Sequence, residues 1–407
     1  MKKTIFILAT AISLLLVLLW PTLAQAETGI TVSGNSAEAQ FPLKLNFNIS
    51  ARSPVNITDV RLHYTVDQES YAVVTSEVYL DFVPATAINT SWTWDMRRTG
   101  GLPPGTVVEY WWTVKDAGGG QVETTPQKIS FDDKRHSWQS LTEGKVTILW
   151  YDGGRSFAQE LMSTAQEALK RLADETGAFL KNPVKIYVYA DASDLQGAMV
   201  FPQEWTGGVA YTRFGAIAIG IAPGNLSWGK RATVHELTHL VTHQMTANPY
   251  NDLPTWLNEG MSMYSEGSLE ADYVNILKTA VRNNDLMTVR TLSSAFSTDP
   301  MKAYLAYAES YSLVEFLIST YGRDKMLELY NAFSRGEGYY DGALEKVYGF
   351  DMDGLNKAWQ DYAKRQYQGA GAVKGMILPE PAEIISGLVN RLLLSWRWAA
   401  QGPGWGW

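Results

Sequence analysis

The apolar residues of this chain change their spacing near residue 140, and this change limits the folds that it can adopt. Residues 43–49 read LKLNFNI and residues 60–66 read VRLHYTV, so every second residue is apolar. That alternation is the period of a half-buried β-strand. Later stretches instead repeat apolar residues every three or four positions, which is helical spacing. The sequence therefore predicts a β-rich part followed by a mainly helical part.

The β-rich part is predicted to span residues 27–135. Residues 102–120, LPPGTVVEYWWTVKDAGGG, give a Pro-Gly turn, a strand and a Gly-rich turn, and this part shows no helical period. We expect an all-β, immunoglobulin-like antiparallel sandwich. It would lack the cysteine pair of antibody domains, because the chain has no cysteine. Residues 131–140, FDDKRHSWQS, are predicted to form a linker.

The second part is predicted to span residues 140–370. Three short apolar stretches, KVTILWY, VKIYVYA and GAIAIGIAP, have the length and composition of strands. Between the first two, residues 157–172 carry a helical apolar face, and Gly177 can end that helix. From Lys230 to about Gln366 the pattern is mostly helical. A few strands followed by a block of helices is an α+β arrangement.

The two ends of the chain are predicted to lie outside these domains. Residues 1–26 contain two early lysines, an apolar run and a final Ala-Gln-Ala, which is the pattern of a cleaved secretory signal peptide. A retained membrane anchor is the alternative. Residues 371–407 form an amphipathic, Trp-rich tail that could lie on a membrane surface or dock on protein. We therefore expect a secreted or extracytoplasmic protein of the bacterial cell envelope.

The composition narrows the classes of function. The absence of cysteine excludes disulfides, a thiol nucleophile and a thiolate metal site. The formal net charge is −8, and loss of the two signal-peptide lysines would make it −10. A chain this acidic argues against nucleic acid as a partner. A secreted chain without disulfides depends on its core, which 46% hydrophobic residues can supply.

Three of the five histidines lie in VHELTHLVTH, residues 234–243. The apolar residues of this stretch fall at helical spacing, so His235 and His239 project from one side of a helix, one turn apart. Two imidazoles at this spacing can hold one zinc ion, and Glu236 can reach a water molecule on that ion. His243 lies two turns, roughly 12 Å, from His235, which is too far to join them. A helix that carries these histidines by chance is the alternative.

A zinc site needs a third protein ligand, and Glu259 in DLPTWLNEGMSMY, residues 252–264, is the candidate. It lies twenty residues after His239, so one helix can end, a loop can turn, and a second helix can present Glu259 to the same ion. Two neutral histidines and one carboxylate would leave a net charge of about +1, which can lower the pKa of a bound water to about 7. A solvated glutamate in the first turn of a helix is the alternative.

HELTH at residues 235–239 followed by WLNEG at residues 256–260 resembles the gluzincin metallopeptidases, and most closely their bacterial peptidase MA-like domains. The resemblance covers about residues 140–368 and implies a zincin-like α+β fold. Residues 215–222 lie where gluzincins place an edge strand beside the metal, so a peptide could pair there by strand addition. A plain core strand is the alternative.

The resemblance also implies roles for single residues. The two histidines and Glu259 would bind zinc, and Glu236 would be the general base. Many gluzincins hydrogen-bond the developing oxyanion with a later tyrosine, and Tyr307 fits this role best. Tyr304 and Tyr311 are the alternatives.

Two departures from the family bear on these roles. Many relatives have an acidic residue four positions after the ligand glutamate, where it orients a zinc-bound histidine, but this chain has Met263. Glu266 or another carboxylate would have to substitute. The Gly-x-Met-Glu-Asn signature, with which the aminopeptidase branch reads a free amine, is absent.

Together these features predict a secreted zinc-dependent peptidase that hydrolyses peptide bonds with zinc-activated water and a glutamate general base. Its partner would be a peptide or protein substrate. One alternative is a catalytically inactive, zinc-stabilised binding module of the cell envelope. A surface interaction protein that acts through its β-rich part and its tail, with peripheral membrane or envelope contact, is another. A zinc hydrolase of a non-peptide ester or amide is the third.

Overall fold

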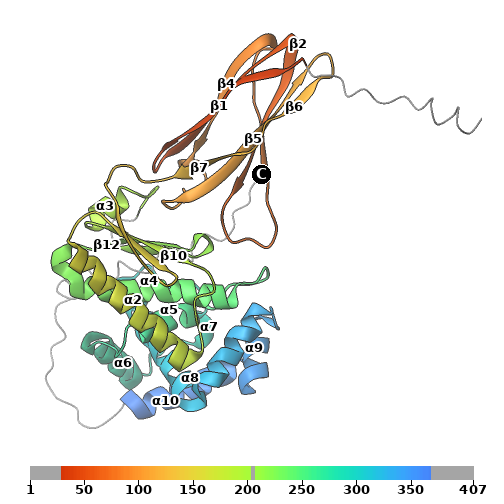
Figure 1. Cartoon of the computed structure of the whole chain (residues 1–407). Helices are drawn as coiled ribbons and strands as arrows, with labels where there is room; N and C mark the ends of the chain where they lie inside the picture. Colours follow the sequence, from red (N-terminus) through yellow and green to blue (C-terminus); the bar gives the residue numbers. More distant parts are fainter. Residues whose placement is uncertain (1–28, 203–206, 368–407) are drawn as a thin grey trace, which may run out of the picture.

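The structure is a computed structural model that describes residues 29–202 and 207–367 (Figure 1). An N-terminal β-rich region is followed by a second part whose C-terminal half is helical, as the change in apolar spacing predicts. The predicted signal peptide, residues 1–26, and the predicted tail, residues 371–407, lie outside the described residues.

Antiparallel strands make up the β-rich region. They are β1 (Thr31–Gln40), β2 (Lys44–Val66), β3 (Ser76–Tyr79), β4 (Ala85–Asp95), β5 (Thr106–Asp116), β6 (Gln121–Glu123) and β7 (Gln127–Phe131), with a 3-10 turn η1 (Met96–Arg98) after β4. The first part of β2 pairs with β1 and β4, and its last part pairs with β5 and β3. Because β2 pairs with β1 and β4 and also with β5 and β3, these strands form one continuous hydrogen-bonded sheet. The immunoglobulin-like sandwich stays a prediction.

The alternation in the sequence has the expected consequence for burial in β2. Leu45, Phe47 and Ile49 are fully buried, whereas the residues between them are partly exposed. Trp112 of β5 is also fully buried in the same core. Burying large side chains such as these stabilises a domain by about 1.5–3 kcal/mol each, so this region can have a core without disulfides.

A second sheet opens the other part of the chain. Its strands are β8 (Gln139–Glu143), β9 (Val146–Trp150), β10 (Val184–Tyr189), β11 (Gly208–Tyr211) and β12 (Ala216–Gly220). They lie in the order β11-β12-β10-β9-β8. The stretches KVTILWY, VKIYVYA and GAIAIGIAP contain β9, β10 and β12, which pair in parallel. Each was expected as a strand.

The expectation that residues 215–222 form an edge strand is wrong, because β12 has β10 on one side and β11 on the other. Every residue of β12 is buried, which is typical of an interior strand. The edge strand on this side of the sheet is β11, which pairs antiparallel with β12. Its four residues are too few to show a period in the sequence.

Helices cover the remaining length of the second part. They are α2 (Arg155–Thr176), α3 (Ala192–Gln196), α4 (Leu226–Thr246), α5 (Thr255–Ser265), α6 (Ala271–Asn283), α7 (Val289–Leu292), α8 (Pro300–Ser334), α9 (Tyr339–Tyr348) and α10 (Met352–Tyr367), with 3-10 turns η2 (Thr212–Phe214) and η3 (Pro223–Asn225). Gly177 ends α2 with φ of 75°, as predicted. One buried cluster joins the sheet to α2, α4, α5 and α8. None of the described helices is both long enough and apolar enough to cross a membrane.

The connection between the two parts is packed, although the sequence predicts a linker at residues 131–140. The side chain of Asp133 is fully buried and accepts hydrogen bonds from Arg135 and from the hydroxyl of Tyr189 in β10. Arg135 also donates to the carbonyl of Gly197, 2.7 Å away. The polar residues of this stretch are therefore partners for the second part, and they hold the β-rich region against it.

Candidate metal centre

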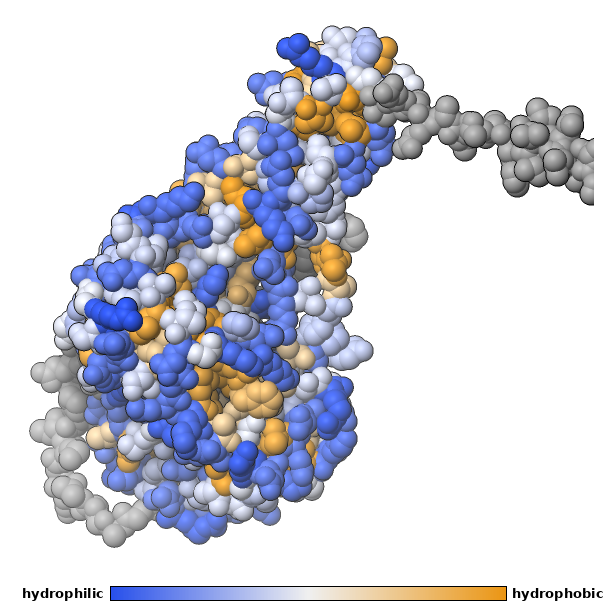
Figure 2. Space-filling model, in the orientation of Figure 1, coloured by the Kyte–Doolittle hydropathy of each residue, from blue (hydrophilic) through white to orange (hydrophobic). Residues whose placement is uncertain are grey.

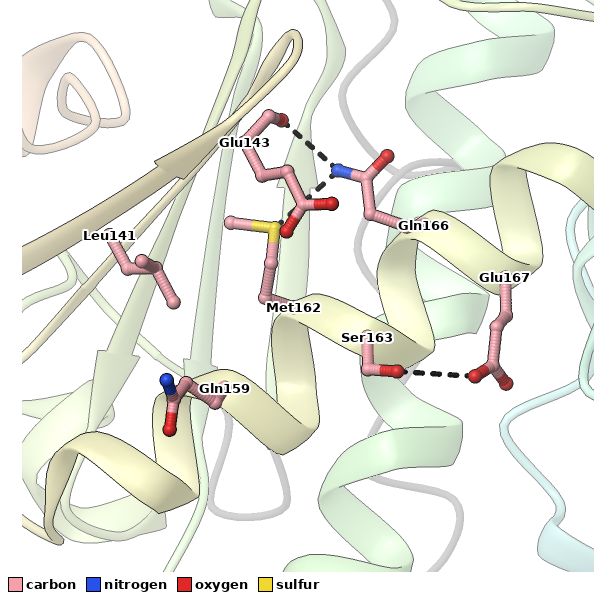
Figure 3. Close-up of a pocket in the computed structure, with 7 residues that line it drawn as sticks. All are labelled: Leu141, Glu143, Gln159, Met162, Ser163, Gln166 and Glu167. Carbon is pink, nitrogen blue, oxygen red and sulfur yellow. Dashed lines mark hydrogen bonds between the residues drawn. The ribbon is translucent and has the colours of Figure 1, made fainter.

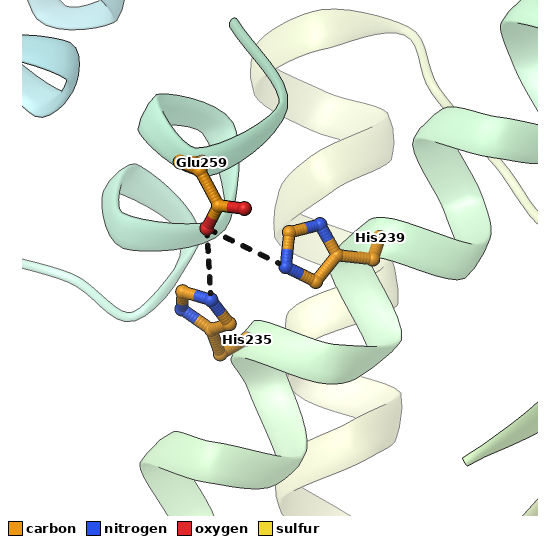
Figure 4. A group of neighbouring side chains, drawn as sticks. All are labelled: His235, His239 and Glu259. Atoms are coloured by element: carbon orange, nitrogen blue, oxygen red, sulfur yellow. Dashed lines mark ion pairs between the residues drawn. The ribbon is translucent and has the colours of Figure 1, made fainter. Parts of the chain in front are cut away.

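Two neighbouring helices, α4 and α5, bring three metal-binding side chains together (Figure 4). His235 and His239 lie on α4, and Glu259 lies on α5. Their exposed fractions are 2%, 7% and 4%. Polar groups buried this deeply are costly without partners, so their contacts decide what the site can hold.

The distances between these side chains suit a shared ion. Glu259 Oε2 lies 3.5 Å from His235 Nε2 and 3.7 Å from His239 Nε2. Ligand atoms of a tetrahedral zinc ion, with bonds of about 2.0–2.1 Å, lie roughly 3.3 Å apart. Among the described residues, His235 Nε2 and Glu259 Oε2 have no hydrogen-bond partner. Two imidazoles and one carboxylate are a donor set that zinc takes in catalytic sites, so the residues present fit that metal.

The charges around His235 favour a cation at this point. Burial alone would lower the pKa of His235, but the neighbouring carboxylates of Glu259 and Glu266 outweigh burial and raise it to about 10. Burial lowers the pKa of His239. In the metal-free protein the proton on His235 supplies the positive charge that the two carboxylates favour. A metal ion would have to displace that proton, because imidazole binds metal in its neutral form.

A carboxylate orients the first histidine. Glu266, in the cap position after α5, places Oε1 2.7 Å from His235 Nδ1 and leaves Nε2 facing Glu259. Arg231, one turn before His235, binds Glu266 at 3.1 Å and also contacts Glu270. The sequence predicts that Glu266 or another carboxylate replaces the acidic residue missing at Met263, and in the structure Glu266 lies against His235.

An amide orients the second histidine. The Oδ1 of Asn258 lies 3.0 Å from His239 Nδ1, and the hydroxyl of Ser262 lies 3.1 Å from the same nitrogen. Neither residue is among those predicted from the sequence. Their places in the sequence could have marked them as partners of the metal ligands, because Asn258 directly precedes Glu259 and Ser262 lies one helical turn after it. Partners of this kind fix the ring orientation and the tautomer of a ligating histidine.

Glu236 lies on the side of the site that faces β11. It is 1% exposed, and its carboxylate accepts a hydrogen bond from the backbone N–H of Ala210. Burial, with the charges of Glu259 and Glu266, raises the pKa of Glu236 to about 8. Its Oε1 has no partner within the described part of the chain. A carboxylate with a raised pKa and one oxygen without a hydrogen-bond partner is suited to accept a proton and release it again.

Close packing of α5 on α8 fixes the distance between Glu259 and the tyrosines of α8. A Cβ on Gly260 would lie 2.3 Å from the carbonyl oxygen of Ser310, so only glycine allows this approach. Tyr307, one turn before Ser310, is 4% exposed and packs edge-on against Phe296. The glycine that follows Glu259 therefore holds two of the predicted site residues on facing helices.

Tyr307 lies in the charge environment of the metal centre. Burial raises its pKa well above the ordinary value, and the charges of Glu259 and Glu236 add to that effect. The ring of Tyr304 stacks on that of Tyr273, with 3.8 Å between the ring centroids, and Tyr311 packs against Tyr264.

His243 lies apart from the three clustered residues, as its two-turn separation from His235 predicts. Its Nε2 is 3.5 Å from Oε2 of Glu69, which belongs to the β-rich region. Burial, with the charge of Arg213, lowers the pKa of His243 to about 4, so its ring is neutral at pH 7. Nothing in the sequence predicts this contact between the two parts.

A separate hollow of about 280 Å³ lies between β8 and α2 (Figure 3). Its polar side chains bond to neighbours: Gln166 donates to the carbonyl of Glu143, and Ser163 donates to Glu167. It shares no lining residue with the metal centre.

Residues 164–365 match the model of the Peptidase MA superfamily. The matched stretch contains α4, α5 and most of α8, so the clustered residues and the partners that orient them lie inside it. This part of the chain is therefore a Peptidase MA superfamily domain. No curated protein matches the sequence.

Three solved structures show a distant likeness to this chain. A mutant of a two-domain M1 zinc metallopeptidase bound to L-arginine is 10% identical, with 87% of this chain and 96% of that chain covered and a TM-score of 0.36. Aminopeptidase A of Legionella pneumophila in complex with aspartic acid is 9% identical, with 81% and 50% covered and a TM-score of 0.34. OgpA of Akkermansia muciniphila is 12% identical, with 25% and 28% covered and a TM-score of 0.20. The chain thus spans about a quarter of OgpA, and scores this low assign neither a fold nor an activity.

Proposed function

We propose that this protein is a secreted zinc-dependent peptidase. The observation that carries the proposal is the meeting of His235, His239 and Glu259 beside the buried carboxylate of Glu236. The superfamily match of the same region supports it. Secretion enters the proposal through the signal-peptide pattern of residues 1–26.

In this proposal the two histidines and Glu259 would hold the zinc ion. When bound, zinc would supply Lewis-acid chemistry, because it polarises a peptide carbonyl and makes a water molecule more acidic. The positive charge of the ion would also counteract the effect of burial on the pKa of Glu236 and favour its ionised form. Glu236 would then take a proton from the attacking water and pass it to the nitrogen of the leaving amine. Tyr307 would donate its hydroxyl hydrogen to the oxyanion.

The substrate would approach along β11. This strand is one of the two edge strands of its sheet, and the N–H of Ala210 bonds to Glu236. A peptide that adds to the outer edge of β11 would have its backbone held by main-chain hydrogen bonds. Its scissile carbonyl would then lie beside the general base. The edge strand expected at residues 215–222 is replaced in this role by residues 208–211.

The direct test is cleavage of a peptide library by the purified protein. We expect hydrolysis that a chelator abolishes and that added zinc restores, with one zinc ion per chain by metal analysis. Zinc binding without cleavage of any peptide would instead favour the inactive, zinc-stabilised binding module. Cleavage that survives complete removal of metal would contradict the proposal.

Replacing Tyr307 with phenylalanine is expected to lower kcat by about 100- to 1,000-fold with little change in KM, because one oxyanion donor is lost. Steady-state kinetics on the best library peptide would measure this effect. Tyr311→Phe removes a hydroxyl from the same helix at a residue that is 7% exposed and is the matched control, expected to keep near-normal activity. Equal losses in both variants would mean that Tyr307 acts only in packing.

Replacing Glu266 with glutamine is expected to weaken zinc binding about 10- to 100-fold, because the residue that orients His235 loses its charge. Competition with a chromogenic chelator would measure the zinc affinity. Glu270→Gln also removes a carboxylate from Arg231 and serves as the control, since it leaves the Glu266–His235 contact in place. Unchanged affinity in Glu266→Gln would show that the contact does not orient the ligand.

A further inference from the structure

A loop of the β-rich region contacts the second part beside the metal centre. Residues 67–75 join β2 to β3, and we call this segment the β2–β3 loop (Figure 1). The backbone N–H of Glu69 donates to the carbonyl of Arg213 at 2.6 Å. The carboxylate of Glu69 lies 3.5 Å from His243 on α4. One residue of the loop therefore touches both the 3-10 turn η2, which follows the edge strand β11, and the helix that carries the clustered histidines.

The contacts of Glu69 with Arg213 and His243 lie a short distance from Glu236, both along the chain that leads from β11 and along α4. Ala210, whose N–H bonds Glu236, is three residues before Arg213. Three residues span about 10 Å at most, and less here, because Thr212 and Arg213 lie in the 3-10 turn η2. Along α4, His243 is one turn, roughly 6 Å, beyond His239. The loop therefore leaves room for only about three residues of an extended peptide between Glu236 and Glu69.

The direction of a docked peptide decides which of its ends meets the loop. Antiparallel pairing is the commoner and slightly more stable arrangement of two strands. β11 runs from Gly208 to Tyr211, towards the loop. A peptide antiparallel to β11 would therefore have its amino-terminal residues at the loop and its carboxyl-terminal residues at the other end of the strand.

We propose that the β2–β3 loop blocks the substrate site beyond Tyr211, so that this protein cleaves within about three residues of the amino terminus of a peptide. The inference rests on the proposed function, because it concerns the substrate of the same site. It assigns the β-rich region a part in substrate selection. Tyr71, Val73 and Val74 are exposed on the loop by 56%, 88% and 56%, so the barrier presents an apolar surface to solvent.

The test uses the full chain, loaded with zinc, and two series of peptides built on one cleaved library sequence. The first series adds one to eight residues before the scissile bond, and the second adds the same residues after it. Mass spectrometry would identify the bond that is cut. We expect kcat/KM to fall at least tenfold once more than about three residues precede the scissile bond. Extensions after the bond should have little effect.

A shortened loop is expected to remove that limit. The register of β2 with β3 pairs Tyr64 with Ser76, and a two-residue Asn-Gly turn in place of residues 67–73 would continue it. In this variant, peptides with long amino-terminal extensions should be cleaved within threefold of the shortest one. Val83→Ser is the control, because Val83 is 85% exposed and lies near Ile57, about 30 Å back along β2. It should keep the length dependence of the unaltered protein.

The wild-type series decides the inference even where the shortened loop fails to fold. Equal kcat/KM for all amino-terminal extensions, or cleavage confined to carboxyl-terminal ends, would overturn it while leaving the peptidase proposal standing. Hydrolysis of no peptide at all would overturn both. A length limit that persists unchanged in a folded shortened-loop variant would show that some other group forms the barrier.

Discussion

Glutamine in place of Glu236 is expected to abolish peptide hydrolysis while the protein keeps its zinc. The general base is lost, and removing proton transfer of this kind costs about 100- to 10,000-fold in rate. Glutamine has nearly the same shape and can still accept from the N–H of Ala210. It also removes a buried group whose ionisation is costly, since burial raises the pKa of Glu236. The variant should therefore be at least as stable as the unaltered protein.

Three measurements on the Glu236→Gln variant separate the roles of this residue. Hydrolysis of the best library peptide should fall to the background rate, metal analysis should still give one zinc per chain, and the thermal melting temperature should not drop. Full activity in a zinc-loaded variant would refute the assignment of Glu236 as the base. Loss of zinc would mean that Glu236 is itself a ligand.

The part of the site that the sequence could predict is the part built on local spacing. A spacing of four positions from His235 to His239 is about one helical turn, and this holds in any helix. The twenty residues from His239 to Glu259 are enough for a helix end and a new helix, and the structure places all three side chains together. The β-rich start and the helical end follow from period in the same way.

The parts that could not be predicted depend on tertiary contacts between residues far apart in the sequence. The edge strand was sought in residues 215–222, because an all-apolar run is visible and a four-residue strand such as β11 is not. The polar composition of residues 131–140 predicts a linker, but it does not indicate that Asp133 and Arg135 bond to the second part. Asn258 contacts His239 and Glu69 contacts His243 because different elements pack together, and the spacing of apolar residues does not predict that packing.

Removing the ligand carboxylate in Glu259→Ala is expected to abolish zinc-dependent stabilisation of the fold. A ligand that binds only the folded state stabilises it by about 2.7 kcal/mol at 100 times Kd and about 4.1 kcal/mol at 1,000 times Kd. For a domain of this size, 1 kcal/mol corresponds to roughly 2–4 °C in melting temperature. Zinc should therefore raise the melting temperature of the metal-free wild-type protein by about 5–15 °C. It should raise that of Glu259→Ala by less than a quarter as much.

The variant should also be less stable than the metal-free wild-type protein, because His235 loses one of the two carboxylates that raise its pKa. The sign follows from that shift: the contribution of a raised histidine pKa is fully present below the unfolded value of about 6.5 and is lost as pH rises through the folded value. The difference in free energy of unfolding between the two metal-free proteins should therefore be larger at pH 6 than at pH 10. Calorimetric scans at both pH values, with chelator or with zinc, would measure it. Glu270→Gln, which leaves the three clustered residues in place, should show the full zinc shift. A zinc shift as large in Glu259→Ala as in the wild-type protein would place the ion elsewhere, since a carboxylate that contributes nothing to its affinity is not a ligand.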